Sequence, residues 1–208
     1  EMNIVEMVRN IFPAKTKDFV TAVDEHCIIL VKEIRDKETT DEIVKTAKTI
    51  SDTISAETGS KAFISIGTAV NDLKDVSRSY KEAKMALEVG RIFDSEKNIV
   101  NYEQLGIGRL IYQLPMSLCE MFVKEVFGDE IPDILDDEEA MSTINKFFEN
   151  NLNISETARQ LYVHRNTLVY RLERIEKAIG LDIRTFDDAM MFRIAVMVIA
   201  HLKDMKNE

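Results

Sequence analysis

The chain has 208 residues, 45% of them hydrophobic, and a formal net charge of −10. Only three prolines and seven glycines occur, which excludes long disordered segments, and no apolar run reaches the ~18 residues expected of a membrane span. Cys27 and Cys119 each lie among apolar neighbours, as the buried free thiols of a cytoplasmic protein do. With no CxxC motif or paired histidines to bind zinc, we expect neither a metal nor another cofactor.

The first hundred residues alternate helices with strands. The predicted elements are helix 2–12 ended by Pro13, strands 18–23 and 27–34 around the turn Asp24-Glu25-His26, helix 39–57 capped by Thr39 or Thr40 and stopped by Gly59, strand 63–67, helix 72–89 ended by Gly90, and strand 99–102. This order predicts an α+β domain over residues 1–103, with helices packed on one sheet. Because the chain starts inside a predicted helix, we expect it to be a fragment of a longer protein.

The rest of the chain is predicted to be helical. Residues 104–139 form a connector, with one helix ended at Pro115 and another over 117–127. Its last part, residues 128–139, is acidic and is typical of a solvated linker, here a hinge. Residues 140–208 form the third predicted region, which begins with a support helix at 142–150.

Residues 154–180 predict two helices joined by a tight turn. Ser155 is the predicted N-cap of the first helix, and Tyr162 and Val163 form the turn. Apolar residues then repeat at helical spacing over about 164–179, at Leu168, Leu172, Ile175 and Ile179. Gly180 lies where a helix-ending glycine is expected.

A last helix begins near Thr185, whose spacing to Asp188 is that of a capping box. It is apolar over more than half of its circumference, so it is either buried in its domain or forms a subunit contact. His201, near its end, is expected to be partly exposed.

Hydrogen-bonding and basic side chains cluster at the amino end and on the polar face of the predicted helix 164–179. A helix-turn-helix protein places this part of its second helix against base edges, and Arg and Asn suit guanine and adenine, respectively. The predicted base contacts are Arg165, Asn166, Thr167, Tyr170 and Arg171, and the predicted phosphate contacts are His164 and Arg174. The alternative from the residues alone is an ordinary helical hairpin with a solvated face.

The segment LYVHRNTLVYRLERIEKAIGLDI resembles the C-terminal helix-turn-helix of the CdaR/PucR group of regulators. Residues that match the group's pattern are Ala158, Leu161, Val163, His164, Arg165, Asn166, Thr167, Leu168, Tyr170, Arg171, Leu172, Arg174, Ile175 and Gly180. Tyr162 departs from helix-turn-helix proteins in general, which usually have glycine at the turn; the turn is therefore either wider here or strained.

Residues 64–91, ISIGTAVNDLKDVSRSYKEAKMALEVGR, resemble the part of GGDEF (diguanylate cyclase-like) domains that follows their signature. The resemblance places Ala22-Val23-Asp24-Glu25-His26 where active cyclases have Gly-Gly-Asp-Glu-Phe. Side chains at Ala22 and Val23 fill the space through which backbone approaches phosphates, and we expect the first strand, which carries a metal-binding Asp in active cyclases, to be absent. We therefore expect no cyclase activity, and we interpret Asp24, Glu25 and His26 as a solvated turn rather than a metal cluster.

Together these features predict a cytoplasmic, non-enzymatic transcriptional regulator that binds double-stranded DNA. Residues from Met141 onward carry a charge of +1 and the first 140 carry −11. One helix-turn-helix of nearly balanced charge, called the reader below, should bind DNA only modestly. We therefore expect a homodimer, in which two readers bind together. The resemblance implies that a small metabolite, such as a sugar diacid or purine derivative, is sensed outside this chain. The alternatives are a protein-interaction or oligomerisation module and a nucleotide-binding enzyme.

Overall fold

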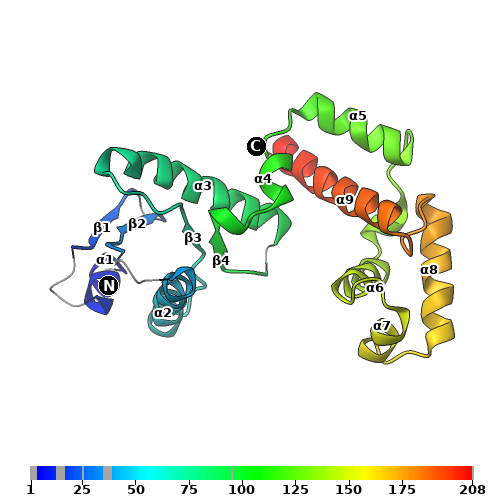
Figure 1. Cartoon of the computed structure of the whole chain (residues 1–208), viewed down its shortest axis with the longest axis horizontal. Helices are drawn as coiled ribbons and strands as arrows, with labels where there is room; N and C mark the ends of the chain where they lie inside the picture. The colour runs from blue at the N-terminus through cyan, green and yellow to red at the C-terminus, as the bar shows by residue number, and fades with distance from the viewer. Residues whose placement is uncertain (1–3, 13–16, 25, 35–38, 95, 208) are drawn as a thin grey trace. The chain divides into compact units, whose positions relative to one another are not determined.

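The computed structural model describes residues 4–12, 17–24, 26–34, 39–94 and 96–207. It divides into two compact units, Glu1–Leu110 and Ile111–Glu208 (Figure 1). The domain boundaries predicted at 103/104 and 139/140 stay predictions. Among the described helices, none combines the length and apolar character needed to cross a membrane.

The first unit mixes short strands with helices, as predicted. Its elements are α1 Ile4–Ile11, β1 Phe19–Ala22, β2 Ile28–Val31, α2 Thr40–Thr58, β3 Ile64–Ile66, the 3-10 turn η1 Leu73–Asp75, α3 Val76–Phe93, β4 Ile99–Asn101, the 3-10 turn η2 Tyr102–Gln104 and α4 Ile107–Ile111, which reaches the unit boundary. Its core gathers Val8, Val20 and Ile50 from α1, β1 and α2.

Strand pairing departs from the single predicted sheet. β1 and β2 form an antiparallel hairpin with Phe19 opposite Val31, and β3 pairs parallel with β4, with Ile64 opposite Ile99. The described strands therefore form two two-stranded sheets. The sequence predicted where strands occur, but partner choice depends on contacts between distant residues, which periodicity does not carry.

Helix ends in this unit test the capping predictions. Thr39 and Glu42 form a reciprocal capping box at the start of α2, and Gly59 ends that helix with φ +69°. Gly90, however, does not end α3, which continues to Phe93. A Cβ atom at Gly90 would lie 2.5 Å from Val100 Cγ2, so this glycine permits the close approach of α3 to β4 instead. The helix predicted to reach Pro115 is shorter than expected, ending at Ile111.

The predicted turn Asp24-Glu25-His26 is only partly visible, since Glu25, like Pro13, lies outside the described residues. The Asp24 carboxylate accepts a hydrogen bond from the His26 amide at 2.7 Å, and both residues are exposed. In the described part of the chain, no three His, Cys, Asp or Glu side chains gather as metal ligands. Asp24 therefore closes its own turn in this structure. Cys119 is buried as predicted, and Cys27 is only half-buried.

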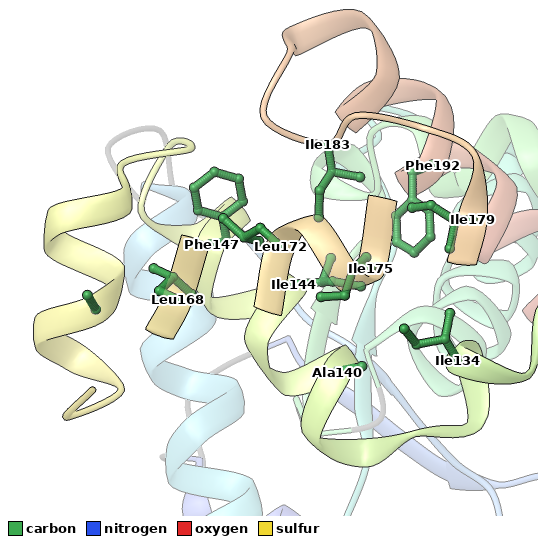
Figure 2. Close-up of a cluster of buried hydrophobic side chains, with 11 residues drawn as sticks. Ile134, Ala140, Ile144, Phe147, Leu168, Leu172, Ile175, Ile179, Ile183 and Phe192 are labelled. Carbon is green, nitrogen blue, oxygen red and sulfur yellow. The ribbon is translucent and has the colours of Figure 1, made fainter. Parts of the chain in front are cut away.

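The second unit is helical. Its elements are α5 Met116–Phe127, the 3-10 turn η3 Asp133–Asp136, α6 Glu138–Glu149, α7 Ile154–Gln160, α8 Arg165–Ile179 and α9 Phe186–Asn207. Gly128 ends α5 with φ +82°, as its position predicted. The core lies between α6, α7, α8 and the start of α9, and Figure 2 shows Ile144, Phe147, Leu172 and Phe192 among its side chains.

Two predicted caps are wrong in detail. α7 begins at Ile154, one residue before Ser155, and its N-cap is Asn153, whose side chain accepts a hydrogen bond from the Glu156 amide at 3.0 Å. At α9, the Thr185 hydroxyl accepts from the Asp188 amide, as a capping box requires. The Asp188 carboxylate instead accepts from the Asp182 amide at 2.8 Å, because the preceding loop folds back over the helix start.

His201 is buried, with 3% of its surface exposed, and the prediction of partial exposure is wrong. It lies on the same side of α9 as Val198 and Leu202, which are also buried. Its ring centroid is 5.4 Å from that of Tyr112. The cause is that α5 packs along α9 and covers a face of α9 that the sequence analysis predicted to be partly exposed.

The acidic segment 128–139 is not a free linker. Ile134 is buried in the core of the second unit, and Leu135 packs beside it. Asp137 is the N-cap of α6 and accepts hydrogen bonds from the amides of Glu139 and Ala140. The segment predicted as a hinge is thus packed against the helices of the second unit. It packs there because apolar residues lie between its carboxylates.

Candidate nucleic-acid interface

α7, a short turn and α8 form the predicted helix-turn-helix. α7 ends in a Schellman motif: the Val163 amide donates to the Ala158 carbonyl at 3.0 Å and the Tyr162 amide to the Arg159 carbonyl at 3.2 Å. His164 then caps α8, its Nδ1 accepting from the Asn166 amide at 3.3 Å. Gly180 ends α8 with φ +75°, so both ends of the predicted helix 164–179 are confirmed.

One face of α8 holds the helix rigidly. Leu168, Leu172, Ile175 and Ile179, the four predicted inward residues, are all buried and pack in the core with α6 and α7 (Figure 2). Ala158 of α7 is also buried and small enough to bring the two helices close together. The side chains on the other face of α8 therefore project from a fixed support.

The predicted base-contacting residues do not all have the same surroundings. Arg165, Asn166, Thr167 and Tyr170 are exposed at the amino end and outer face of α8. Arg165 takes part in no ion pair within the described residues. Tyr170 also lines a shallow hollow with Glu173, Arg174 and Lys177. This surface presents two hydrogen-bonding side chains, Arg165 and Asn166, on successive residues at the helix start.

Two predicted DNA-contacting arginines are instead paired with acids from the start of α6. Arg171 Nη2 lies 2.6 Å from Glu139 Oε1, and Arg174 Nη2 lies 3.2 Å from Asp137 Oδ2. Only 31% of the Arg171 side chain is exposed. Sequence reasoning missed both acids, because it assigned them to a solvated linker. The signal for them was present: Asp137 followed by Glu138 and Glu139 has the acidic first turn of a helix.

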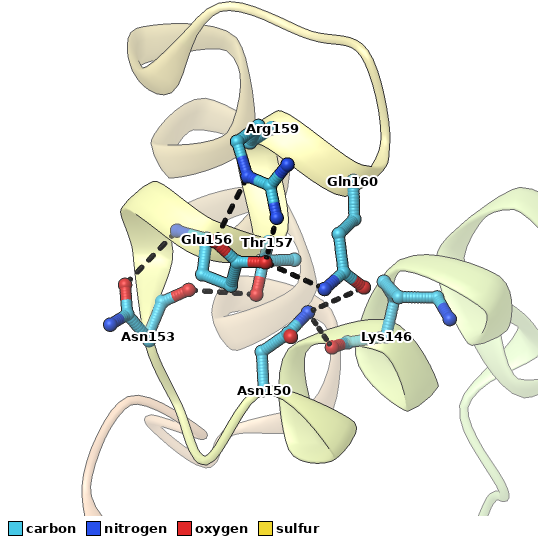
Figure 3. Close-up of polar contacts among 7 residues, drawn as sticks. All are labelled: Lys146, Asn150, Asn153, Glu156, Thr157, Arg159 and Gln160. Atoms are coloured by element: carbon cyan, nitrogen blue, oxygen red, sulfur yellow. Dashed lines mark hydrogen bonds and ion pairs between the residues drawn. The ribbon is translucent and has the colours of Figure 1, made fainter.

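A polar network joins the end of α6 to α7 (Figure 3). The Glu156 carboxylate accepts from Arg159 at 2.6 Å and from Gln160 at 2.7 Å. The Arg159 hydrogen bond, then that of Gln160, lowers the pKa of Glu156 to about 2. Gln160 in turn accepts from Asn150 Nδ2 at 3.2 Å, so the network fixes α7 relative to its support helix.

Comparison with known proteins agrees with this geometry. Residues 140–198 match the PucR C-terminal helix-turn-helix domain, and residues 2–89 match the GGDEF-like domain. The chain therefore contains the two kinds of domain that these models describe. Its α+β GGDEF-like domain followed by a helical helix-turn-helix domain confirms the predicted fold class.

Three curated relatives are regulators by name. The chain is 29% identical to the purine catabolism regulatory protein of Bacillus subtilis, 26% to the proline-responsive transcriptional activator PutR of the same organism, and 28% to the carbohydrate diacid regulator of Escherichia coli. These matches cover 69%, 66% and 65% of this chain. They cover 27%, 34% and 35% of the relatives, so the chain spans about a third of their length. The prediction of a regulator rather than a cyclase agrees with all three.

Proposed function

We propose that this chain regulates transcription by binding duplex DNA with α8 in the major groove. The exposed neighbours Arg165 and Asn166, at the start of a helix fixed by its buried face, carry this proposal. Arg165 reads guanine and Asn166 reads adenine through bidentate hydrogen bonds. Thr167, Tyr170 and Arg171 complete the base contacts, and His164 and Arg174 bind flanking phosphates.

Arg171 and Arg174 can contact DNA only after each has broken its ion pair with an acidic side chain of the same chain. Their partners, Glu139 and Asp137, are exposed or half-buried, and such surface ion pairs contribute only about 0–1 kcal/mol. A phosphate or base edge can therefore displace them. Arg165 needs no such exchange, and for this reason we place it at the centre of recognition.

Two copies of the reader are proposed to bind as a homodimer. A single reader of nearly balanced charge binds weakly, and two readers one helical turn of DNA apart, about 34 Å, match a two-fold symmetric site. Exposed apolar side chains on α5 and α9, including Leu118, Met121 and Met190, supply surface for a second copy. We propose that a small metabolite, sensed outside this chain, changes the spacing of the readers in the cytoplasm.

The test is a titration of the chain against duplex DNA from upstream of its own gene and against a scrambled duplex, at two salt concentrations. Arg165→Ala should weaken binding to the upstream duplex by about 1–3 kcal/mol and remove the preference for it. Arg193→Ala is the matched control, because Arg193 is an exposed arginine on α9 and its loss changes the charge equally.

The possible outcomes distinguish base-specific binding, purely electrostatic binding and a protein-interaction function. A preference that Arg165→Ala abolishes and Arg193→Ala leaves intact supports base reading by α8. Equal binding to both duplexes that disappears with salt would mean electrostatic contact alone. No binding by the unmodified chain at low salt would support the interaction-module alternative. Sedimentation of the chain with and without DNA tests the proposed dimer.

A further inference from the structure

Tyr162 occupies a backbone conformation that glycine usually fills. It is the residue just after the end of α7, at the left-handed position of the Schellman motif, with φ +55°. Positive φ is uncommon for residues other than glycine, asparagine and aspartate. A tyrosine at this position therefore strains the turn, and the turn hydrogen bonds give no reason for its side chain.

The end of α6 provides an internal comparison. There the Leu152 amide donates to the Phe147 carbonyl and the Asn151 amide to the Phe148 carbonyl, each at 3.0 Å. This is the same motif as at α7, and its left-handed residues are Asn151, with φ +52°, and Leu152, with φ +61°. Asparagine is the usual substitute for glycine at this position. Leu152 is not suited to a positive φ either, but its side chain packs against the core of the second unit, which can hold it in this conformation.

Packing does not explain Tyr162. Its surface is 95% exposed, the highest value among the exposed large hydrophobic residues of the described chain. The side chain lies two residues before His164, the cap of α8, and so stands at the amino end of the proposed recognition helix. Strain at a residue whose surface is this exposed indicates a role outside the folded unit.

We propose that Tyr162 contacts the sugar-phosphate backbone of duplex DNA beside the groove that α8 enters. Its phenol hydroxyl donates a hydrogen bond to a phosphate oxygen, a charge-assisted contact, and the ring lies against the adjoining sugar. Contacts to the backbone position a reader without carrying sequence information. Tyr162 thus fixes the depth and angle of α8, while Arg165 and Asn166 read bases. This inference rests on the proposed DNA binding by α8.

The experiment compares the full chain with Tyr162→Gly, Tyr162→Phe and the control Phe186→Ala, on the upstream and the scrambled duplex. Phe186 is also an exposed aromatic residue, at the start of α9 and beyond the carboxyl end of α8. Tyr162→Gly should weaken binding to both duplexes about five- to tenfold. Its salt dependence should stay unchanged, because no charge is lost. Tyr162→Phe should lose the hydroxyl's share of this affinity, and Phe186→Ala should bind like the unmodified chain.

Thermal unfolding identifies the cause of any loss. Tyr162→Gly should unfold at the same temperature as the unmodified chain or higher, because glycine relieves the positive φ. Weaker DNA binding together with equal or higher stability supports the proposal. Unchanged binding to both duplexes overturns it, as does a loss of binding that accompanies a lower unfolding temperature. If the unmodified chain itself binds no DNA, the proposed function fails instead.

Discussion

Replacing Glu139 by glutamine tests whether the acids of α6 compete with DNA for the arginines of α8. Glu139 Oε1 is 2.6 Å from Arg171 Nη2, so the carboxylate occupies the guanidinium that is proposed to contact DNA. Glutamine keeps the size of the side chain and removes its charge. We expect Glu139→Gln to bind DNA more tightly than the unmodified chain.

The structure bounds the size of this gain. The Glu139 side chain is 68% exposed, and an exposed ion pair contributes about 0.2–1 kcal/mol. Breaking it beforehand therefore improves binding by at most about fivefold, and the gain shrinks as salt screens the pair. The free energy of unfolding falls by the same small amount. Fluorescence anisotropy with a labelled duplex, over a series of salt concentrations, measures the gain.

Glu138→Gln is the matched control. Glu138 is the neighbouring exposed acid in the first turn of α6, and it forms no ion pair with another described residue. Both variants raise the net charge by one, but only Glu139→Gln releases Arg171. Equal gains in the two variants would refute competition at Arg171. Weaker binding by Glu139→Gln would show instead that Glu139 positions Arg171 for DNA.

Three further changes test the packing and the polar contacts inside the two units. Leu168→Ala, at a fully buried position, should lower the free energy of unfolding by about 2–5 kcal/mol in urea denaturation of the second unit. Gly90→Ala should destabilise the first unit by roughly 1–3 kcal/mol, because the new Cβ would meet Val100 Cγ2 at 2.5 Å, and Val100→Ala in the same chain should restore part of the loss. Glu156→Gln should lower the thermal unfolding temperature at neutral pH but not near pH 2. The pKa of Glu156 is lowered from 4.5 to about 2 in the folded chain. The carboxylate therefore stabilises the fold above about pH 4.5, and this stabilisation is lost as the pH falls towards 2 and the carboxylate is protonated. An equal effect of Glu156→Gln at both pH values would contradict this assignment.

The helix-turn-helix was predictable because its determinants are local. The buried stripe from Leu168 to Ile179, the stop at Gly180 and the polar cluster at the helix start all lie within a few turns of one helix. Even the departure at Tyr162 could be recognised, since a non-glycine residue at a tight turn has few conformations available. Its φ of +55° in the structure shows that the turn is strained rather than wider.

Features that depend on distant residues were missed. Gly90 looked like a helix end, and only the approach of Val100 from β4 explains it. His201 was predicted to be partly exposed, but it is buried because α9 packs along α5. Asp137 and Glu139 were assigned to a solvated run of charges. The apolar residues Ile134 and Leu135 in the same segment indicated instead that the segment packs against a core. In each case the sequence showed the residue but not the partner from elsewhere in the chain.

Under the proposed function, the acids beside α8 bear on how a chain with net charge −10 would distinguish one DNA sequence from another. Non-specific binding depends on positive charge near phosphates, and residues 128–139 bring seven acids and no base into the unit that carries α8. Pairing Arg171 and Arg174 with two of these acids reduces attraction to every sequence alike. The base contacts proposed for Arg165 and Asn166 are not reduced, because neither residue is paired with those acids. We infer that this arrangement sacrifices affinity on all DNA to raise the ratio of specific to non-specific binding, the quantity on which finding one site among many depends.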